Sequence, residues 1–129
     1  MPASYAKYFW EIPAGLRDIA GETPVSAAQR ELLEETGLEA EVWEPLVSYF
    51  PSPGCSDEKV QLYAALNPRE SAEAIDFQRE AEEAELAAQW WDLAEVCSAI
   101  FRGSLCSSVV VAGILAVSAN SQEWIAKLQ

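Results

Sequence analysis

Nine residues, Arg30 to Leu38, constrain this chain more than any other stretch of its sequence. Glu31, Glu34 and Glu35 are spaced i, i+3 and i+4, so on a helix the three carboxylates share one face. Like charges at that spacing repel one another and destabilise a helix that has no ligand. A hard divalent cation such as Mg²⁺ or Mn²⁺, which prefers carboxylate oxygens, reverses that repulsion. The pattern predicts a metal-holding helix, and its alternative is a solvated acidic face.

The flanking residues predict where this helix begins and ends. Thr23 is an N-cap residue type and Pro24 suits the first helical position. Gly37 is the usual residue where a helix ends. The expected helix is therefore amphipathic, with carboxylates on one side and apolar residues on the other, namely Val25, Ala28, Leu32, Leu33 and Thr36.

Size and charge limit the partners of the chain. A length of 129 residues suits a single domain, 1–129, and a hydrophobic fraction of 50% provides enough apolar residues for a core. The formal charge is −13, from 21 acidic and 8 basic residues. Nucleic-acid backbones and anionic membrane surfaces both require a basic face, so neither is an expected partner. An acidic protein can still bind a phosphorylated ligand when metal ions neutralise both partners.

The chain has three cysteines and no histidine, which limits the catalytic groups and metal sites that it can form. An odd number of cysteines without CxxC spacing predicts reduced thiols and a cytoplasmic location. Without histidine there is no Ser-His-Asp triad and no zinc site of the histidine type. A general base must then be a carboxylate, or else Lys, Tyr or Cys. No signal peptide is visible, and the apolar stretch from Val109 to Val117 is too short to span a membrane.

The remaining chain predicts an alternation of strands and helices. We expect a turn-rich loop at 51–57 and an acidic segment at 67–85 that is either a solvated loop or a frayed helix. Strands are expected at 8–12, 41–50, 58–66 and 86–92, the last one including Trp90-Trp91. Helices are expected from Pro24 to Thr36, from the N-cap Asp92 through Phe101, and from Ser104 or Ser107 to about Ala119, with a separate turn or two at 122–128.

The order Gly15, Glu22, Arg30-Glu31-Leu32-Leu33-Glu34-Glu35-Thr36-Gly37-Leu38 resembles the Nudix box, here 15–38. Six residues rather than five separate Gly15 from Glu22, a spacing that resembles some ADP-ribose pyrophosphatases. Pro53, fifteen positions after Leu38, resembles a proline typical of that subfamily, although it also suits an ordinary turn. The resemblance extends from about residue 8 to the end, and residues 80–86 resemble the acidic catalytic loop of the subfamily.

The resemblance implies a Nudix hydrolase that uses Mg²⁺ (or Mn²⁺) to hydrolyse a nucleoside diphosphate linked to another moiety. A nucleoside diphosphate sugar is the implied substrate, with ADP-ribose cleaved to AMP and ribose 5-phosphate. By resemblance the site residues are Glu31, Glu35, Glu34 and the Ala14 carbonyl as metal ligands, Glu82, Glu83 and Glu34 as catalytic residues, Arg30, Glu22 and Gly37 as a structural brace, and Pro53 in the substrate loop. For Glu82 and Glu83 a solvated surface is the competing interpretation.

The fold implied is α/β, a Nudix-like α/β/α sandwich with a mixed sheet. Only fourteen residues precede Gly15, so we expect the usual N-terminal strands to be missing and apolar surface to be exposed. The chain is then a fragment, a homodimer whose second copy completes the sheet, or a compact fold without the substrate pocket. The last case gives an alternative function, a catalytically weak metal- or nucleotide-binding or interaction domain.

Overall fold

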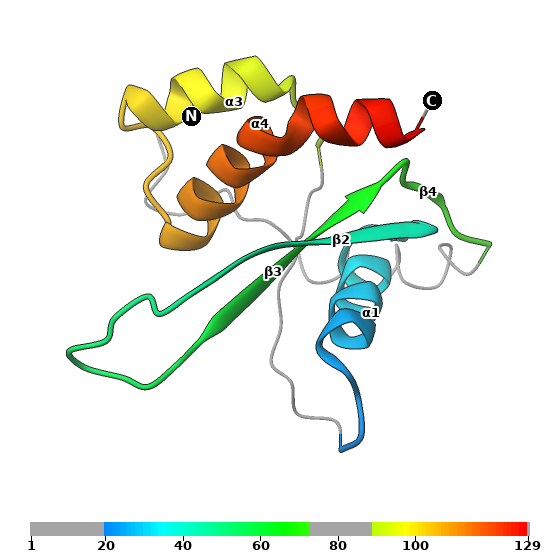
Figure 1. Cartoon of the computed structure of the whole chain (residues 1–129), viewed down its shortest axis with the longest axis horizontal. Coiled ribbons are helices and arrows are strands. Elements are labelled where there is room, and N and C mark those ends of the chain that lie inside the picture. The colour runs from blue at the N-terminus through cyan, green and yellow to red at the C-terminus, as the bar shows by residue number, and fades with distance from the viewer. Residues whose placement is uncertain (1–19, 73–88, 129) are drawn as a thin grey trace. The chain divides into compact units, whose positions relative to one another are not determined.

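The computed structural model describes residues 20–72 and 89–128 (Figure 1). This part of the chain contains helices and short antiparallel strands, which confirms the predicted α/β class. The chain divides into two compact units, one made of residues 13–45 and 63–90 and the other of residues 1–12, 46–62 and 91–129. The elements are α1 (Pro24–Thr36), β1 (Leu38–Glu39), β2 (Val42–Tyr49), β3 (Val60–Leu66), β4 (Arg69–Glu70), α3 (Leu93–Phe101) and α4 (Ser108–Leu128).

Both ends of α1 lie where the sequence predicts them. Thr23 is the N-cap, and its hydroxyl accepts a 3.2 Å hydrogen bond from the backbone N–H of Ser26. Pro24 occupies the first helical position, where its missing N–H costs no helical bond. At the other end Gly37 adopts a left-handed conformation, with φ 73° and ψ 12°, and donates its N–H to the carbonyl of Leu33 at 2.8 Å. The predicted helix is confirmed.

The chain leaves α1 directly into a small sheet that the sequence did not predict. β1 pairs antiparallel with β4 in the register Leu38↔Glu70 and Glu39↔Arg69. The backbone N–H of Ser71 extends this pairing by donating to the Gly37 carbonyl at 3.0 Å, and Ser71 itself is buried. The C-terminal end of α1 is thereby joined to a segment more than thirty residues later in the sequence. The expectation of only loop or frayed helix at 67–85 is wrong for Arg69–Glu70, while residues 73–85 lie outside the described part.

The second sheet consists of β2 and β3, close to the two strands predicted at 41–50 and 58–66. The ten residues between them form the expected loop, in which the backbone N–H groups of Cys55 and Ser56 both donate to the Ser52 carbonyl at 2.9 Å. The ammonium group of Lys59 lies 5.8 Å from the ring centre of Phe50, a cation–π contact at the base of the loop. The strand expected at 8–12 lies outside the described residues, and the described strands form two separate sheets of two.

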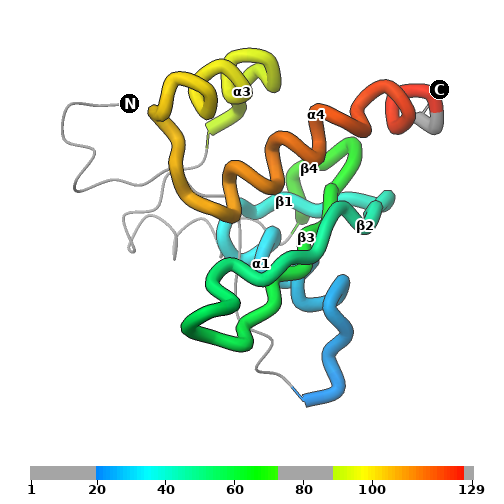
Figure 2. Tube along the Cα trace, turned by 60° about the vertical axis from the view of Figure 1, so that its left-hand side comes forward, coloured from blue at the N-terminus to red at the C-terminus, as the bar shows by residue number. Residues whose placement is uncertain are grey.

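The C-terminal helices α3 and α4 pack against each other (Figures 1 and 2). α3 begins after Asp92, as predicted, although the Asp92 side chain makes no capping hydrogen bond. α4 starts after Ser107, whose carbonyl accepts from the N–H of Val111 at 2.9 Å. The predicted break near Ala119 is wrong, because α4 continues without interruption to Leu128.

The strand predicted at 86–92 is wrong for the residues that are described, since 89–92 are neither strand nor helix. The aromatic pair that suggested a strand is exposed, Trp90 by 76% and Trp91 by 53%. A β-prone aromatic sequence still needs a partner strand to bury one face, and no described strand pairs with it.

Few of the described side chains are buried. The buried apolar residues are Ala27, Ala64, Val110 and Trp124, whereas the exposed large ones are Val42, Val47, Phe50, Trp90, Trp91, Phe101 and Ile125. α4 is also longer than the apolar stretch seen in sequence: over Ser108–Ala126 its length and mean hydropathy of 1.3 would suffice to cross a membrane. Core helices of soluble proteins meet the same criteria, so this property alone does not assign α4 to a membrane.

Candidate metal and catalytic site

Arg30 ties the loop before α1 to the second turn of that helix. Its Nε donates to Oε2 of Glu22 at 2.9 Å, and its Nη2 donates to Oε1 of the same carboxylate at 3.1 Å. The two parallel bonds form the fork geometry that makes arginine–carboxylate pairs directional. The Arg30 and Glu22 side chains are only 24% and 11% exposed. The resemblance implies that both residues brace the box, and in the structure the two side chains are paired.

The third nitrogen of Arg30 reaches the carboxylates that were predicted as metal ligands. Nη1 donates to Oε1 of Glu31 at 3.0 Å and to Oε2 of Glu34 at 3.3 Å. Glu31 is mostly covered, with 15% of its side chain exposed, whereas Glu34 is 41% exposed. The hydrogen bond to Glu22, followed by the negative charges of Glu22, Glu31 and Glu34, raises the pKa of Arg30 against the opposing effect of burial. Arg30 therefore carries its charge throughout the working pH range.

The carboxylates of α1 fit a hard divalent cation by their chemistry, because all three are oxygen donors on one short segment. Glu31 uses Oε1 for Arg30 and has a second oxygen, Oε2, outside that contact. Within the described ranges, however, no three acidic or cysteine side chains are gathered closely enough to hold an ion.

The other predicted site residues are placed only in part. Gly37 ends α1, as expected, and is buried. Pro53 lies in the turn of the 50–59 loop and is exposed. Ala14, Glu82 and Glu83 lie outside the described residues, so their assignment as backbone ligand and catalytic carboxylates stays a prediction.

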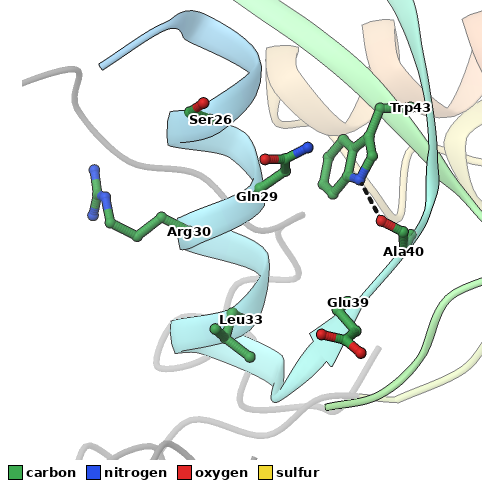
Figure 3. A pocket seen from close by; sticks show the side chains of 7 residues that line it. All are labelled: Ser26, Gln29, Arg30, Leu33, Glu39, Ala40 and Trp43. Carbon is green, nitrogen blue, oxygen red and sulfur yellow. Dashed lines mark hydrogen bonds between the residues drawn. The ribbon is translucent and has the colours of Figure 1, made fainter. Parts of the chain in front are cut away.

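A cavity of about 420 Å³ lies between α1 and the segment that follows it, and it was not foreseen from the sequence (Figure 3). One wall is the indole of Trp43, whose Nε1 donates to the Ala40 carbonyl at 2.9 Å. Figure 3 shows the Gln29 side chain pointing toward Trp43, whereas the Arg30 guanidinium points away from it. The described residues that line the cavity are Ser26, Gln29, Arg30, Leu33, Glu39, Ala40 and Trp43. The helical spacing of the first four could have indicated a shared face.

A second arginine forms a comparable ion cluster between β1 and β4. Arg69 donates through Nη1 to Oε1 of Glu41 at 2.8 Å and through Nε to Oε1 of Glu39 at 3.1 Å. The bond to Glu41, then that to Glu39, raises the pKa of Arg69. These side chains are exposed, so the cluster adds little to stability. The sequence did not indicate this ion cluster, because Arg69 lies some thirty residues from its partners in sequence.

Comparison with known proteins identifies the family of the chain. The family model of the NUDIX domain matches residues 3–108. An ADP-ribose pyrophosphatase of Mycobacterium tuberculosis (strain ATCC 25618 / H37Rv) is 42% identical over 116 residues, 90% of this chain and 55% of that protein. A methanol dehydrogenase activator of Bacillus methanolicus is 48% identical over 51% of this chain and 36% of its own length. An ADP-ribose pyrophosphatase of Bacillus subtilis (strain 168) is 39% identical over 58% of this chain and 38% of its own.

The chain thus spans about half or less of the length of these curated relatives. The match of the family model nevertheless covers most of the 129 residues, including all of α1 and its Arg30–Glu22 brace. The predicted family and the α/β fold are both confirmed. The chain belongs to the Nudix family.

Proposed function

We propose that this protein hydrolyses a nucleoside diphosphate linked to another moiety, with a divalent metal ion, and that its substrate is ADP-ribose. The observation that carries the proposal is the fork between Arg30 and Glu22, because it fixes the loop of the box against the helix that presents Glu31, Glu34 and Glu35. The likeness to the Mycobacterium tuberculosis ADP-ribose pyrophosphatase, over 90% of this chain, supports the choice of substrate.

In the proposed reaction the oxygen of a water molecule forms a bond to one phosphorus of the diphosphate. The bridging P–O bond breaks, and its electron pair leaves with the departing phosphate, so that ADP-ribose yields AMP and ribose 5-phosphate. The proton lost by the water is taken by a carboxylate, since the chain has no histidine. Glu82 is our choice for this base and Glu83 is the second choice.

The residues that would hold the metal are Glu31 and Glu35, with Glu34 as a further ligand or orienting group and the Ala14 carbonyl as a backbone ligand. Mg²⁺, or Mn²⁺ in its place, would supply neutralisation of the diphosphate charge and a lower pKa for the attacking water. The protein's own contribution is orientation. Arg30 and Glu22 hold the helix against the loop, and Pro53 stiffens the loop after β2.

The direct test is incubation of the purified protein with ADP-ribose and Mg²⁺, with AMP and ribose 5-phosphate measured by chromatography. We expect turnover within the ordinary enzyme range of roughly 1–10³ s⁻¹. Glu35→Gln should abolish it, whereas Glu123→Gln, which removes one exposed carboxylate from α4, should not change it. Absence of AMP, together with no effect of Glu35→Gln on any nucleotide substrate, would disprove the proposal.

A second candidate is a metal- or nucleotide-binding domain with little catalysis. The observation that favours it is that no described group of three acidic side chains is arranged to hold an ion. Calorimetry distinguishes the two candidates, because a binding domain takes up Mg²⁺ or ADP-ribose and releases no AMP. Turnover in the ordinary range eliminates this candidate.

We also propose a cytoplasmic homodimer. The support for the dimer is the set of large apolar side chains left exposed in the part of the chain that is described, Phe50 and Phe101 among them. The support for the location is that Cys55, Cys97 and Cys106 are all free thiols. Light scattering coupled to size-exclusion chromatography tests the dimer, and a well-folded monomer at micromolar concentration would contradict it.

A further inference from the structure

One nitrogen of Arg30 contacts two of the carboxylates that the metal is expected to use. Nη1 carries two N–H groups and gives one to Glu31 at 3.0 Å and the other to Glu34 at 3.3 Å. The remaining donors, Nε and Nη2, are both engaged by Glu22. The guanidinium thus has two halves with different partners, one on the loop and one on the helix.

We propose that Nη1 of Arg30 and the divalent metal compete for Glu31 and Glu34, so that Arg30 is a built-in counter-ion which metal binding displaces. Arg30 then keeps its fork on Glu22 while its Nη1 loses the two helix carboxylates. This inference rests on the proposed function in one respect, namely that α1 is the metal-binding helix.

Contact and charge together support the competition. Nη1 donates to one oxygen of each carboxylate, and a Mg²⁺ ion that binds either carboxylate comes within about 2.0–2.1 Å of an oxygen, close to the guanidinium. A dication beside a guanidinium is repelled by it, and screening is weak where side chains are partly covered, as Glu31 is.

The arrangement also explains how α1 tolerates its acidic face. Glu31, Glu34 and Glu35 at i, i+3 and i+4 repel one another, and one arginine on the same helix offsets part of that repulsion. The metal supplies the same compensation with twice the charge. The two cations are therefore alternatives, and each stabilises the helix when the other is not engaged.

The test measures Mn²⁺ binding without nucleotide, from the electron paramagnetic resonance signal of free Mn²⁺. Arg30→Gln removes the competing charge, and we expect Mn²⁺ to bind about three- to tenfold more tightly than to the unaltered chain. Arg69→Gln is the matched control, because it makes the same change in net charge at an arginine whose partners are Glu39 and Glu41. We expect Arg69→Gln to stay within about twofold of the unaltered chain.

Other results of the same measurement would overturn the proposal. If Arg30 instead positions Glu31 for the metal, Arg30→Gln weakens Mn²⁺ binding, and that outcome, or no change, overturns the proposal. An equal tightening in Arg69→Gln overturns it as well, because bulk charge would then be the cause. If circular dichroism shows that Arg30→Gln does not fold, Mn²⁺ binding is measured on Arg30→Lys instead. A lysine keeps the competing charge and should stay within about twofold, whereas loss of a positioning fork weakens binding beyond that.

Failure of this inference and failure of the proposed function give different results. If no nucleotide is hydrolysed but Arg30→Gln tightens Mn²⁺ binding, the counter-ion role stands and the hydrolase proposal falls. If ADP-ribose is hydrolysed and Arg30→Gln loosens Mn²⁺ binding, the hydrolase stands and the counter-ion role falls. If neither the unaltered chain nor Arg30→Gln binds Mn²⁺, both the metal assignment and the counter-ion role are wrong.

Discussion

Replacing Gly37 by alanine tests whether the end of α1 depends on a left-handed residue. Gly37 has φ 73° and ψ 12°, a conformation in which a Cβ atom crowds the following carbonyl oxygen. Its N–H and C=O are both used, by Leu33 on the helix side and by Ser71 on the sheet side. The backbone therefore cannot relax toward a right-handed conformation without losing one of these hydrogen bonds.

The expected cost follows from two opposing terms. The left-handed conformation costs a non-glycine residue about 1–2 kcal/mol. Alanine also restricts the unfolded chain, which returns about 0.4–1 kcal/mol. The net loss in the free energy of unfolding for Gly37→Ala should be about 1 kcal/mol. Gly37→Asn should cost about half as much, since asparagine visits this region more readily.

Urea unfolding followed by far-ultraviolet circular dichroism and by tryptophan fluorescence measures this loss. With a slope of about 2 kcal/mol per molar urea, the midpoint should fall by about 0.5 M. Gly54→Ala is the matched control, because Gly54 lies outside the left-handed region and an added Cβ meets nothing within 4 Å. Its midpoint should stay the same or rise. Equal midpoints for Gly37→Ala and the unaltered chain, or an equal fall in Gly54→Ala, would refute the reasoning.

Three further predictions concern a cap, a buried hydroxyl and the metal. Thr23→Ala removes the acceptor of the Ser26 N–H and should lower the free energy of unfolding by about 1 kcal/mol, with Thr23→Ser close to unchanged in the same urea assay. Tyr49→Phe removes a buried hydroxyl that has no hydrogen-bond partner among the described residues, and it should raise the melting temperature or leave it unchanged; a fall of several degrees would contradict this. Treatment with EDTA should abolish the proposed hydrolysis, and added Mg²⁺ should restore it, whereas Ca²⁺ at the same concentration is the control for bulk ionic strength.

Helix α1 was predictable because its signals are local. The N-cap Thr23, the proline after it and the terminal Gly37 all act within a few residues of the backbone groups they serve. The brace between Arg30 and Glu22 was expected by resemblance, and eight residues of separation put it within reach of one side chain. That Arg30 also contacts Glu31 and Glu34 was not predicted, because sequence spacing alone does not indicate the direction of its side chain.

The wrong predictions concern segments whose structure depends on hydrogen-bond partners that the sequence pattern does not reveal. The pairing of β1 with β4 joins residues about thirty positions apart, and two-residue strands carry no periodic signal. The break predicted near Ala119 was wrong because polar residues there bond back to their own helix. Asn120 donates to the Ala116 carbonyl at 2.7 Å, and the Ser121 hydroxyl donates to the Ser118 carbonyl at 3.1 Å. Polar residues that suggested a loop are thereby accommodated inside α4.

The bond from Ser71 to Gly37 has a consequence for the order of folding. α1 needs only contacts within one helix, and β2 and β3 are joined by a ten-residue loop, whereas the bond from Ser71 closes a loop of more than thirty residues. Loop closure on that scale has to be completed before the contact contributes any stability, so the junction between β1 and β4 should form after the rate-limiting step. Substitutions at Arg69 or Ser71 should then accelerate unfolding and leave the refolding rate nearly unchanged, which makes this junction the natural place to alter how long the folded state lasts.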